Sequence, residues 1–244
     1  MMRNLEIHIC NMKRLGIIAA LDSEFAQVAA LLSNVVKGEI NGLPFIEGDF
    51  GSNLRIGLAK SGIGKVCATV GTVELIKSFN PDFLINTGVA GGIDASLNVM
   101  DVVVSTQVAY HDVWCGEGSM GQVQGFPLYF DSCKEMVDIA LQVKGTVPVK
   151  SGLIVTGDQF ISDKEQLAKI KSQFPQAMAV DMESAAIGHV CYMYNIPYMS
   201  FRIMSDTPGA NEDNFSQYMD FWKSIADSSF AVCKSFLSEL DNTL

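Results

Sequence analysis

The sequence is poor in positive charge. Its 244 residues include 17 Lys and Arg against 27 Asp and Glu, and the formal net charge is −10. The basic residues form no run and do not alternate with aromatic residues, as they do along a nucleic-acid groove or in a polybasic membrane patch. The chain therefore predicts neither a nucleic-acid partner nor a membrane partner. Side chains able to clamp a phosphate with two parallel hydrogen bonds are limited to Arg3, Arg14, Arg55 and Arg202.

Long apolar runs are absent as well. No stretch approaches the ~20 apolar residues of a transmembrane helix, and residues 1–11 lack the charged head and apolar run of a signal peptide. Because a strand-like segment begins only after Met12, we expect residues 1–11 to be an N-terminal extension without fixed structure or a misassigned start. No Ser/Pro-rich linker or internal repeat divides the remainder, so we expect residues 12–244 to form one domain.

Few residues have the spacing of a metal site or a catalytic nucleophile. The six cysteines show no CxxC pattern, the three histidines are scattered, and no serine lies in a GxSxG motif. We expect no metal, reduced thiols and a cytoplasmic protein. His111 precedes Asp112, but adjacent side chains usually point apart, so a catalytic dyad is the less favoured interpretation. His189 lies within a helical pattern, where a core or interface histidine is expected.

Short apolar segments alternate with helical patterns along the chain. With 48% hydrophobic residues, the chain is long enough to bury one large core. The strand patterns cover residues 14–20, 43–60 as a hairpin, 83–86, 101–105, 150–156, 177–180 and 197–204. The helical patterns cover residues 22–32, 66–78, 134–141, 163–174, 184–195 and 214–240. This alternation predicts an α/β fold with a mixed sheet.

Two segments are predicted to be irregular. Residues 87–92 (TGVAGG) indicate a glycine-rich turn, which lacks both GxGxxG spacing and a Walker lysine and is therefore a weak phosphate signal. Residues 110–129 are rich in glycine and aromatic residues and follow neither the helix nor the strand period. We expect a long loop there, and long loops in compact domains are usually functional.

Acidic side chains follow the predicted strands. In an α/β fold the functional residues gather at the carboxyl ends of strands. Several carboxylates at one cleft suit the cleavage of a glycosidic bond, where one activates water and another protonates the leaving group. The same residues can also have local structural roles, as helix caps, as partners of the helix dipole or as turn residues. The residues concerned are Asp22, Glu24, Asp158, Asp181, Glu183 and Asp206, with Ser205 beside the last.

Seven motifs follow one another along the chain: GIIAALDSE (16–24), KSGIGKV (60–66), INTGVAGG (85–92), YHD (110–112), TGDQFI (156–161), FPQAMAVDMESAAIGHVC (174–191) and FRIMSD (201–206). Taken in this order, they resemble those of the 5′-methylthioadenosine/S-adenosylhomocysteine nucleosidases of the nucleoside phosphorylase family. The resemblance covers residues 12 to about 240. It implies a single-domain, three-layer α/β/α fold with a central mixed, partly barrel-like sheet. The implied reaction is hydrolysis of the N-glycosidic bond, without a cofactor, to adenine and a 5-thio-substituted ribose.

The resemblance implies a division of catalytic roles. Glu24 is the base that polarises the attacking water, Asp206 is the acid that protonates adenine N7, and Ser205 orients that region. Carboxylates around the sugar stabilise a ribosyl cation. Since Asp206 must hold a proton at the moment of reaction, we predict a raised pKa for it in an enclosed pocket.

The resemblance also implies the substrate contacts. Glu183 holds the ribose hydroxyls, Met182 packs beneath the sugar, and Phe160 stacks on the purine. The backbone of Ile161 reads the purine edge, and Arg202 lies near the water and the ribose. The substrate-binding set is completed by Val89, Gly91 and Asp181.

Three departures from the family pattern are visible. Val89 replaces a serine, Asp181 replaces a glutamate, and residues 113–118 (VWCGEG) replace the run that normally follows YHD. In the family this loop helps to form the 5′-substituent pocket of the neighbouring subunit. We therefore expect a homodimer with residues 113–130 near the neighbouring active site, and the preferred 5′ group stays open.

Two alternatives to hydrolysis stay open. A phosphorolytic purine nucleoside phosphorylase needs cationic groups or several N–H donors for the phosphate dianion, and the chain has few arginines. This scarcity favours water as the nucleophile. The other alternative is a nucleoside-binding protein that retains the pocket without turnover.

Overall fold

The computed structural model describes residues 12–145, 147–208, 214–224 and 228–243. The predicted extension at residues 1–11 lies outside these ranges, and the single domain over residues 12–244 stays a prediction. The strands are β1 Lys13–Ala19, β2 Ser33–Ile40, β3 Leu43–Phe50, β4 Leu54–Lys60, β5 Phe83–Gly92, β6 Val102–Tyr110, β7 Phe130–Asp131, β8 Val149–Thr156, β9 Ala177–Asp181 and β10 Tyr198–Asp206. The helices are α1 Asp22–Ala29, α2 Lys65–Phe79, α3 Lys134–Gln142, α4 Lys164–Gln173, α5 Ser184–Tyr194, α6 Asn214–Ser224 and α7 Ser228–Thr243.

The strands form one mixed sheet that closes partly on itself. Its order is β10-β6-β8-β9-β5-β1-β4-β3-β2, and β10 also pairs with β5. Strands β5, β10, β6, β8 and β9 therefore make a closed ring, from which β1, β4, β3 and β2 extend. The ring contains three parallel pairs, β5–β10, β6–β8 and β8–β9, and two antiparallel pairs, β6–β10 and β5–β9. This architecture confirms the expected mixed, partly barrel-like sheet.

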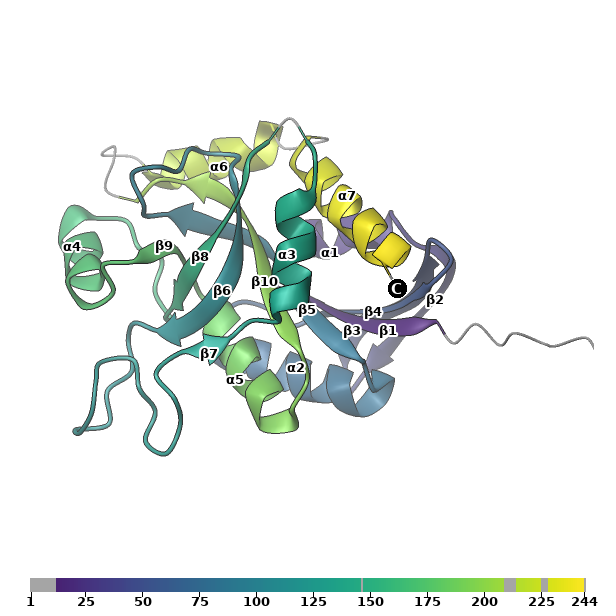
Figure 1. Cartoon of the computed structure of the whole chain (residues 1–244), viewed down its shortest axis with the longest axis horizontal. Coiled ribbons are helices and arrows are strands. Elements are labelled where there is room, and N and C mark those ends of the chain that lie inside the picture. The colour runs from purple at the N-terminus through teal and green to yellow at the C-terminus, as the bar shows by residue number, and fades with distance from the viewer. Residues whose placement is uncertain (1–11, 146, 209–213, 225–227, 244) are drawn as a thin grey trace, which may run out of the picture.

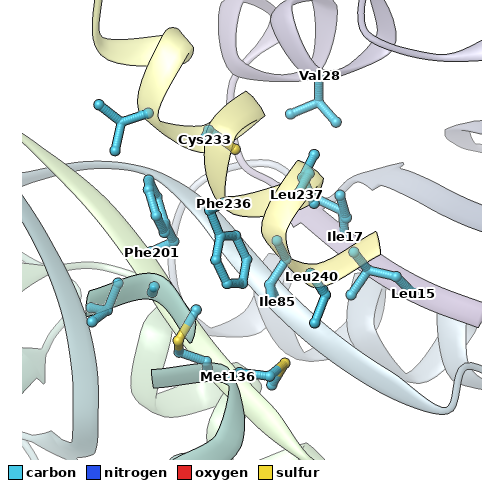
Figure 2. Close-up of a cluster of buried hydrophobic side chains, with 14 of the residues drawn as sticks. Leu15, Ile17, Val28, Ile85, Met136, Phe201, Cys233, Phe236, Leu237 and Leu240 are labelled. Carbon is cyan, nitrogen blue, oxygen red and sulfur yellow. The ribbon is translucent and has the colours of Figure 1, made fainter. Parts of the chain in front are cut away.

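Helices cover both sides of the sheet (Figure 1). Helices α2 and α5 pack together on one side, while α1, α3 and α7 lie on the other. The core beneath α7 is formed by aliphatic and aromatic side chains from several elements (Figure 2), and Phe236 of α7 stacks on Phe201 of β10 at 5.6 Å between ring centroids. The sequence-based prediction of three α/β/α layers is thus confirmed.

Three details differ from the predicted pattern. Residues 87–92 continue β5 instead of forming a turn, since Gly91 and Gly92 pair with Val180 and Ala179 of β9. Strand β2 was not predicted, because it is exposed along nearly all of its length and lacks an apolar period. The predicted helix over 214–240 is wrong as one element, because α6 and α7 run in different directions (Figure 1).

No helix in the described ranges is both long and apolar enough to cross a bilayer.

Candidate active site

A cavity of about 380 Å³ lies at the carboxyl ends of β5, β9 and β10. It is walled by the chain that follows β1, by the loop after β8 and by α6. The structure brings all eleven predicted site residues to this one cavity: Glu24, Val89, Gly91, Phe160, Ile161, Asp181, Met182, Glu183, Arg202, Ser205 and Asp206.

Glu24 combines a helix-capping role with a place in the cavity. Its Oε2 accepts hydrogen bonds from the backbone N–H groups of Ala20 at 3.0 Å and Leu21 at 2.9 Å, and its Oε1 accepts one from Val89 at 3.1 Å. Burial raises the pKa of Glu24, although Arg202 and the three N–H donors act in the opposite direction. A buried carboxylate with a raised pKa is a suitable general base.

Arg202 is buried within a group of acceptors. Its Nη2 lies 2.7 Å from Asp181 Oδ2 and 3.3 Å from Glu183 Oε2, and it also donates to Asn86 Oδ1. Its Nη1 donates to the carbonyl oxygen of Val89 at 3.4 Å. A buried charge is tolerated when it is paired and hydrogen-bonded in this way.

Asp181 is the residue that ties Arg202 to the start of α5. Besides its ion pair with Arg202, it accepts hydrogen bonds from the hydroxyl of Thr156 and from the backbone N–H of Ser184 at 3.2 Å. Its side chain is almost fully covered. Asp181 therefore lines the cavity and binds the N-terminus of α5, but it ends β9 and is not part of the first turn of the helix.

Glu183 reaches the cavity between two donors. Its Oε1 accepts a hydrogen bond from the backbone N–H of Gly64 at 2.9 Å, and its Oε2 faces Arg202. Burial raises the pKa of Glu183, and nearby Asp181 raises it further, whereas Arg202 lowers it. Gly64, which immediately precedes α2, was not predicted as a site residue because its contribution is a main-chain N–H.

Asp206 ends β10 and has a separate donor for each oxygen. The hydroxyl of Ser205 donates to Oδ1 at 2.7 Å, and Nδ2 of Asn214 donates to Oδ2 at 3.1 Å. Burial raises the pKa of Asp206, and both hydrogen bonds oppose the shift without cancelling it. The pKa of Asp206 is therefore shifted in the direction predicted for the acid that protonates the leaving group.

Aromatic side chains form the outer part of the cavity. The ring of Phe160 lies edge-on to Phe215, with centroids 6.1 Å apart, and to Tyr218 at 5.7 Å. Phe215 and Tyr218 belong to α6 and were missed, since a helical pattern does not reveal which helix faces a cleft. An aromatic wall of this kind suits a planar base.

Several of the acidic candidates lie outside the cavity. The side chain of Asp22 is 90% exposed and pairs with Lys60. Asp112 accepts from Lys65 Nζ at 2.8 Å and from the backbone N–H of Asp158 at 2.9 Å, so Asp112 and Asp158 tie loops together. None of these three acidic residues lines the cavity.

The two histidines in the described ranges occupy structural environments. His189 Nδ1 lies 3.2 Å from the hydroxyl of Tyr110, and its ring stacks on Phe130. His111 is buried, and burial lowers its pKa. Within the described ranges, no group of three or more His, Cys, Asp or Glu side chains has the arrangement of a metal site.

Comparisons with known proteins show which family this chain belongs to. The Phosphorylase superfamily profile matches residues 14–238. A 5′-methylthioadenosine/S-adenosylhomocysteine nucleosidase of Actinobacillus succinogenes is 38% identical over 232 residues, which cover 93% of this chain and 100% of that protein. The chain belongs to this nucleosidase family.

Solved structures of similar nucleosidases have the same fold as this chain. The enzyme from Colwellia psychrerythraea, in complex with adenine, superposes with a TM-score of 0.87 at 34% identity, covering 94% of this chain and 96% of that chain. The enzyme from Neisseria meningitidis, in complex with methylthio-immucillin-A, gives a TM-score of 0.86 at 33% identity, covering 96% and 100%. This nucleosidase therefore has the nucleoside phosphorylase fold and is an N-ribosyl hydrolase.

The departures from the nucleosidase pattern have local explanations. Val89 contributes its backbone N–H to Glu24 and its carbonyl oxygen to Arg202, and neither contact depends on the side chain. Asp181 is short, but Thr156 and Ser184 both reach its carboxylate. The third departure, residues 113–118, lies outside the cavity of this single chain.

Proposed function

We propose that this protein hydrolyses the N-glycosidic bond of 5′-methylthioadenosine, S-adenosylhomocysteine or both. The products are adenine and the ribose that carries the 5-thio substituent. Similar nucleosidases that bind adenine or methylthio-immucillin-A support this choice of substrate.

The reaction uses two carboxyl groups with opposite tasks. Water adds to C1′ of the ribose as the C1′–N9 bond breaks, and Glu24 accepts a proton from that water. The electron pair of the broken bond moves into the adenine ring, and protonated Asp206 delivers its proton to N7. The cation that develops on the sugar is stabilised by Glu24 and by Glu183, which also holds the ribose hydroxyls.

The proposal is carried by one observation: the charge of Arg202 is neutralised by the acidic groups around it. Among the described residues that line the cavity, Arg202 is the only one with a cationic side chain, and Asp181, Glu183 and Asn86 already occupy it. A phosphate dianion needs unpaired cationic or multiple N–H donors, whereas water does not. The geometry therefore favours hydrolysis over phosphorolysis.

Adenine release in phosphate-free buffer tests the proposal. With 5′-methylthioadenosine, we expect free adenine from the unmodified protein, and we expect Glu24→Gln and Asp206→Asn to lower kcat by roughly two or more orders of magnitude. The control is Asp22→Asn, since this neighbouring acid is exposed and lies outside the cavity. Adenine that appears only after phosphate is added would identify a phosphorylase, and tight binding without cleavage would identify a binding protein.

The preferred 5′ group is measured separately. The kcat/KM values for 5′-methylthioadenosine, S-adenosylhomocysteine and adenosine report how strongly the site selects the thio substituent. Equal values would mean that the altered 113–118 segment forms no selective pocket.

We also propose a cytoplasmic homodimer in which residues 113–130 approach the neighbouring active site. Exposed apolar side chains support a partner surface: Ile63 lies just before α2, Val66 and Val70 lie in the first half of α2, and Trp114 lies in the 113–130 loop. Val66 is 74% exposed and Trp114 is 62% exposed. Free thiols at all five described cysteines support a reducing compartment.

A further inference from the structure

Asn214 joins two parts of the cavity that are distant in the sequence. It is the first residue of α6 and is 2% exposed. Its Nδ2 donates to Asp206 Oδ2 at 3.1 Å and to the carbonyl oxygen of Ile161 at 3.0 Å. Because both neighbours are acceptors, the amide nitrogen must face them.

We propose that Asn214 is a positioning residue for the leaving-group acid. It holds the carboxyl group of Asp206 in a fixed relation to the backbone of Ile161, which borders the purine. The inference rests on the proposed function, because it presumes that Asp206 delivers a proton to the departing base.

The hydrogen bonds of Asp206 explain why an amide suits this position. Ser205 restrains Oδ1 and Asn214 restrains Oδ2, so the plane of the carboxyl group is fixed. The Nδ2 group of Asn214 is only a donor and cannot take the proton of Asp206. The acid proton therefore stays available to the base, and Asn214 stabilises the carboxylate that is left after transfer.

The same residue links the acid to the position of α6. Phe215 and Tyr218 of this helix contact Phe160 at the mouth of the cavity. Gln217 Oε1 also accepts a hydrogen bond from the backbone N–H of Thr207 at 3.2 Å, directly after β10. A displacement of α6 thus removes the aromatic wall and the partner of Asp206 together.

The pH dependence gives a readout specific to this role. An acid catalyst loses activity as the pH rises through its pKa, and loss of an N–H donor to the carboxylate raises that pKa. The substitution Asn214→Leu should therefore move the basic limb of kcat/KM to higher pH. This variant adds no ionisable group and leaves the others around the cavity in place: Tyr218 on α6, Glu24 on α1, Asp181 and Glu183 before α5, and Arg202 on β10.

Two substrates separate positioning of the acid from general structural damage. One is 5′-methylthioadenosine, and the other is a 5-methylthio-ribofuranoside of 4-nitrophenol, whose leaving group departs without protonation. For Asn214→Leu and the isosteric Asn214→Asp, we expect kcat/KM for the adenine nucleoside to fall roughly 10- to 100-fold. The aryl riboside should change less than about threefold, as in Asp206→Asn. The control on the same helix is Met219→Ala, whose side chain is exposed and outside the cavity.

The outcomes distinguish this inference from the proposed function. Equal losses on both substrates, no loss in either Asn214 variant, or an unshifted basic limb in Asn214→Leu would overturn the positioning role. If the unmodified protein cleaves 5′-methylthioadenosine and only Asp206→Asn impairs it, the function stands and the inference fails. If the unmodified protein releases no adenine, the proposed function itself fails.

Discussion

Gly88 lies between the arginine and the proposed base. A Cβ atom built on it would lie 2.5 Å from Arg202 Nη1 and 2.6 Å from Glu24 Oε1. Both atoms belong to buried charged groups that are held by several hydrogen bonds. A glycine at this point of β5 therefore allows Arg202 and Glu24 to approach the same stretch of backbone.

The substitution Gly88→Ala tests this close approach. The added methyl group must displace Arg202 or Glu24, and a misplacement of about 1 Å in an active site costs roughly 100-fold in rate. We expect kcat/KM for 5′-methylthioadenosine to fall by that order. Gly38→Ala is the matched control, because a Cβ at Gly38 meets no atom within 4 Å. Similar activity in both variants would contradict the steric argument.

At the residue scale, side chains with distinctive chemistry were predictable and main-chain donors were not. The acids at strand ends indicated glycosidic chemistry from the sequence alone, and the family motifs assigned individual roles. Gly64 was not predicted because every residue except proline has a backbone N–H group, and its position opposite Glu183 depends on tertiary structure. Asn214 escaped notice because its partners Asp206 and Ile161 meet only in the folded protein.

At the scale of elements, one ion-pair cluster joins three segments near the cavity. Lys65 begins α2, Asp112 follows β6 and Asp158 follows β8. The backbone N–H of Lys65 donates to Asp158 Oδ1 at 2.8 Å, while its Nζ lies 2.8 Å from both oxygens of Asp112. The adjacent N–H of Gly64 binds Glu183. The cluster therefore fixes the start of α2, on which the position of Glu183 depends.

The substitution Asp112→Asn should loosen this cluster. A hydrogen bond to a charged group contributes about 1.5 to 3 kcal/mol, and we expect kcat/KM to fall roughly tenfold, mainly through KM. Since Glu183 is proposed to hold the ribose hydroxyls, selectivity over the 2′-deoxy substrate should fall as well. The control is Asp22→Asn, which removes the ion pair between Asp22 and Lys60, because the Asp22 side chain is exposed and such a pair contributes little. A loss confined to kcat, with unchanged selectivity, would argue against the link.

Elements with a clear apolar period were predicted well. Elements whose conformation depends on pairing with a neighbouring strand were not. Strand β8 and helix α4 followed their patterns closely. The glycines of β5 suggested a turn, yet pairing with β9 and β10 keeps that segment extended. Strand β2 pairs with β3 at the sheet edge, and an exposed strand needs no apolar alternation.

At the scale of the whole molecule, the proposed dimer makes a prediction about mass. Light scattering should give twice the 26.5 kDa of the chain. Val66→Glu should shift the protein toward the monomer, because it places a charge in the proposed apolar contact. Leu141→Glu on α3 is the control, as Leu141 is also exposed but its helix lies on the opposite side of the sheet from α2. A protein of 26.5 kDa before mutation would refute the dimer.

The closed ring of strands has a consequence for how this protein can change over evolution. Each strand of the ring has partners on both sides, so the ends that carry Asp181, Arg202 and Asp206 keep a constant register. The loop over residues 113–129 lies outside that hydrogen-bonded ladder. Insertions or exchanges in this loop can therefore diversify the accepted nucleosides while the bond-cleaving groups are inherited unchanged.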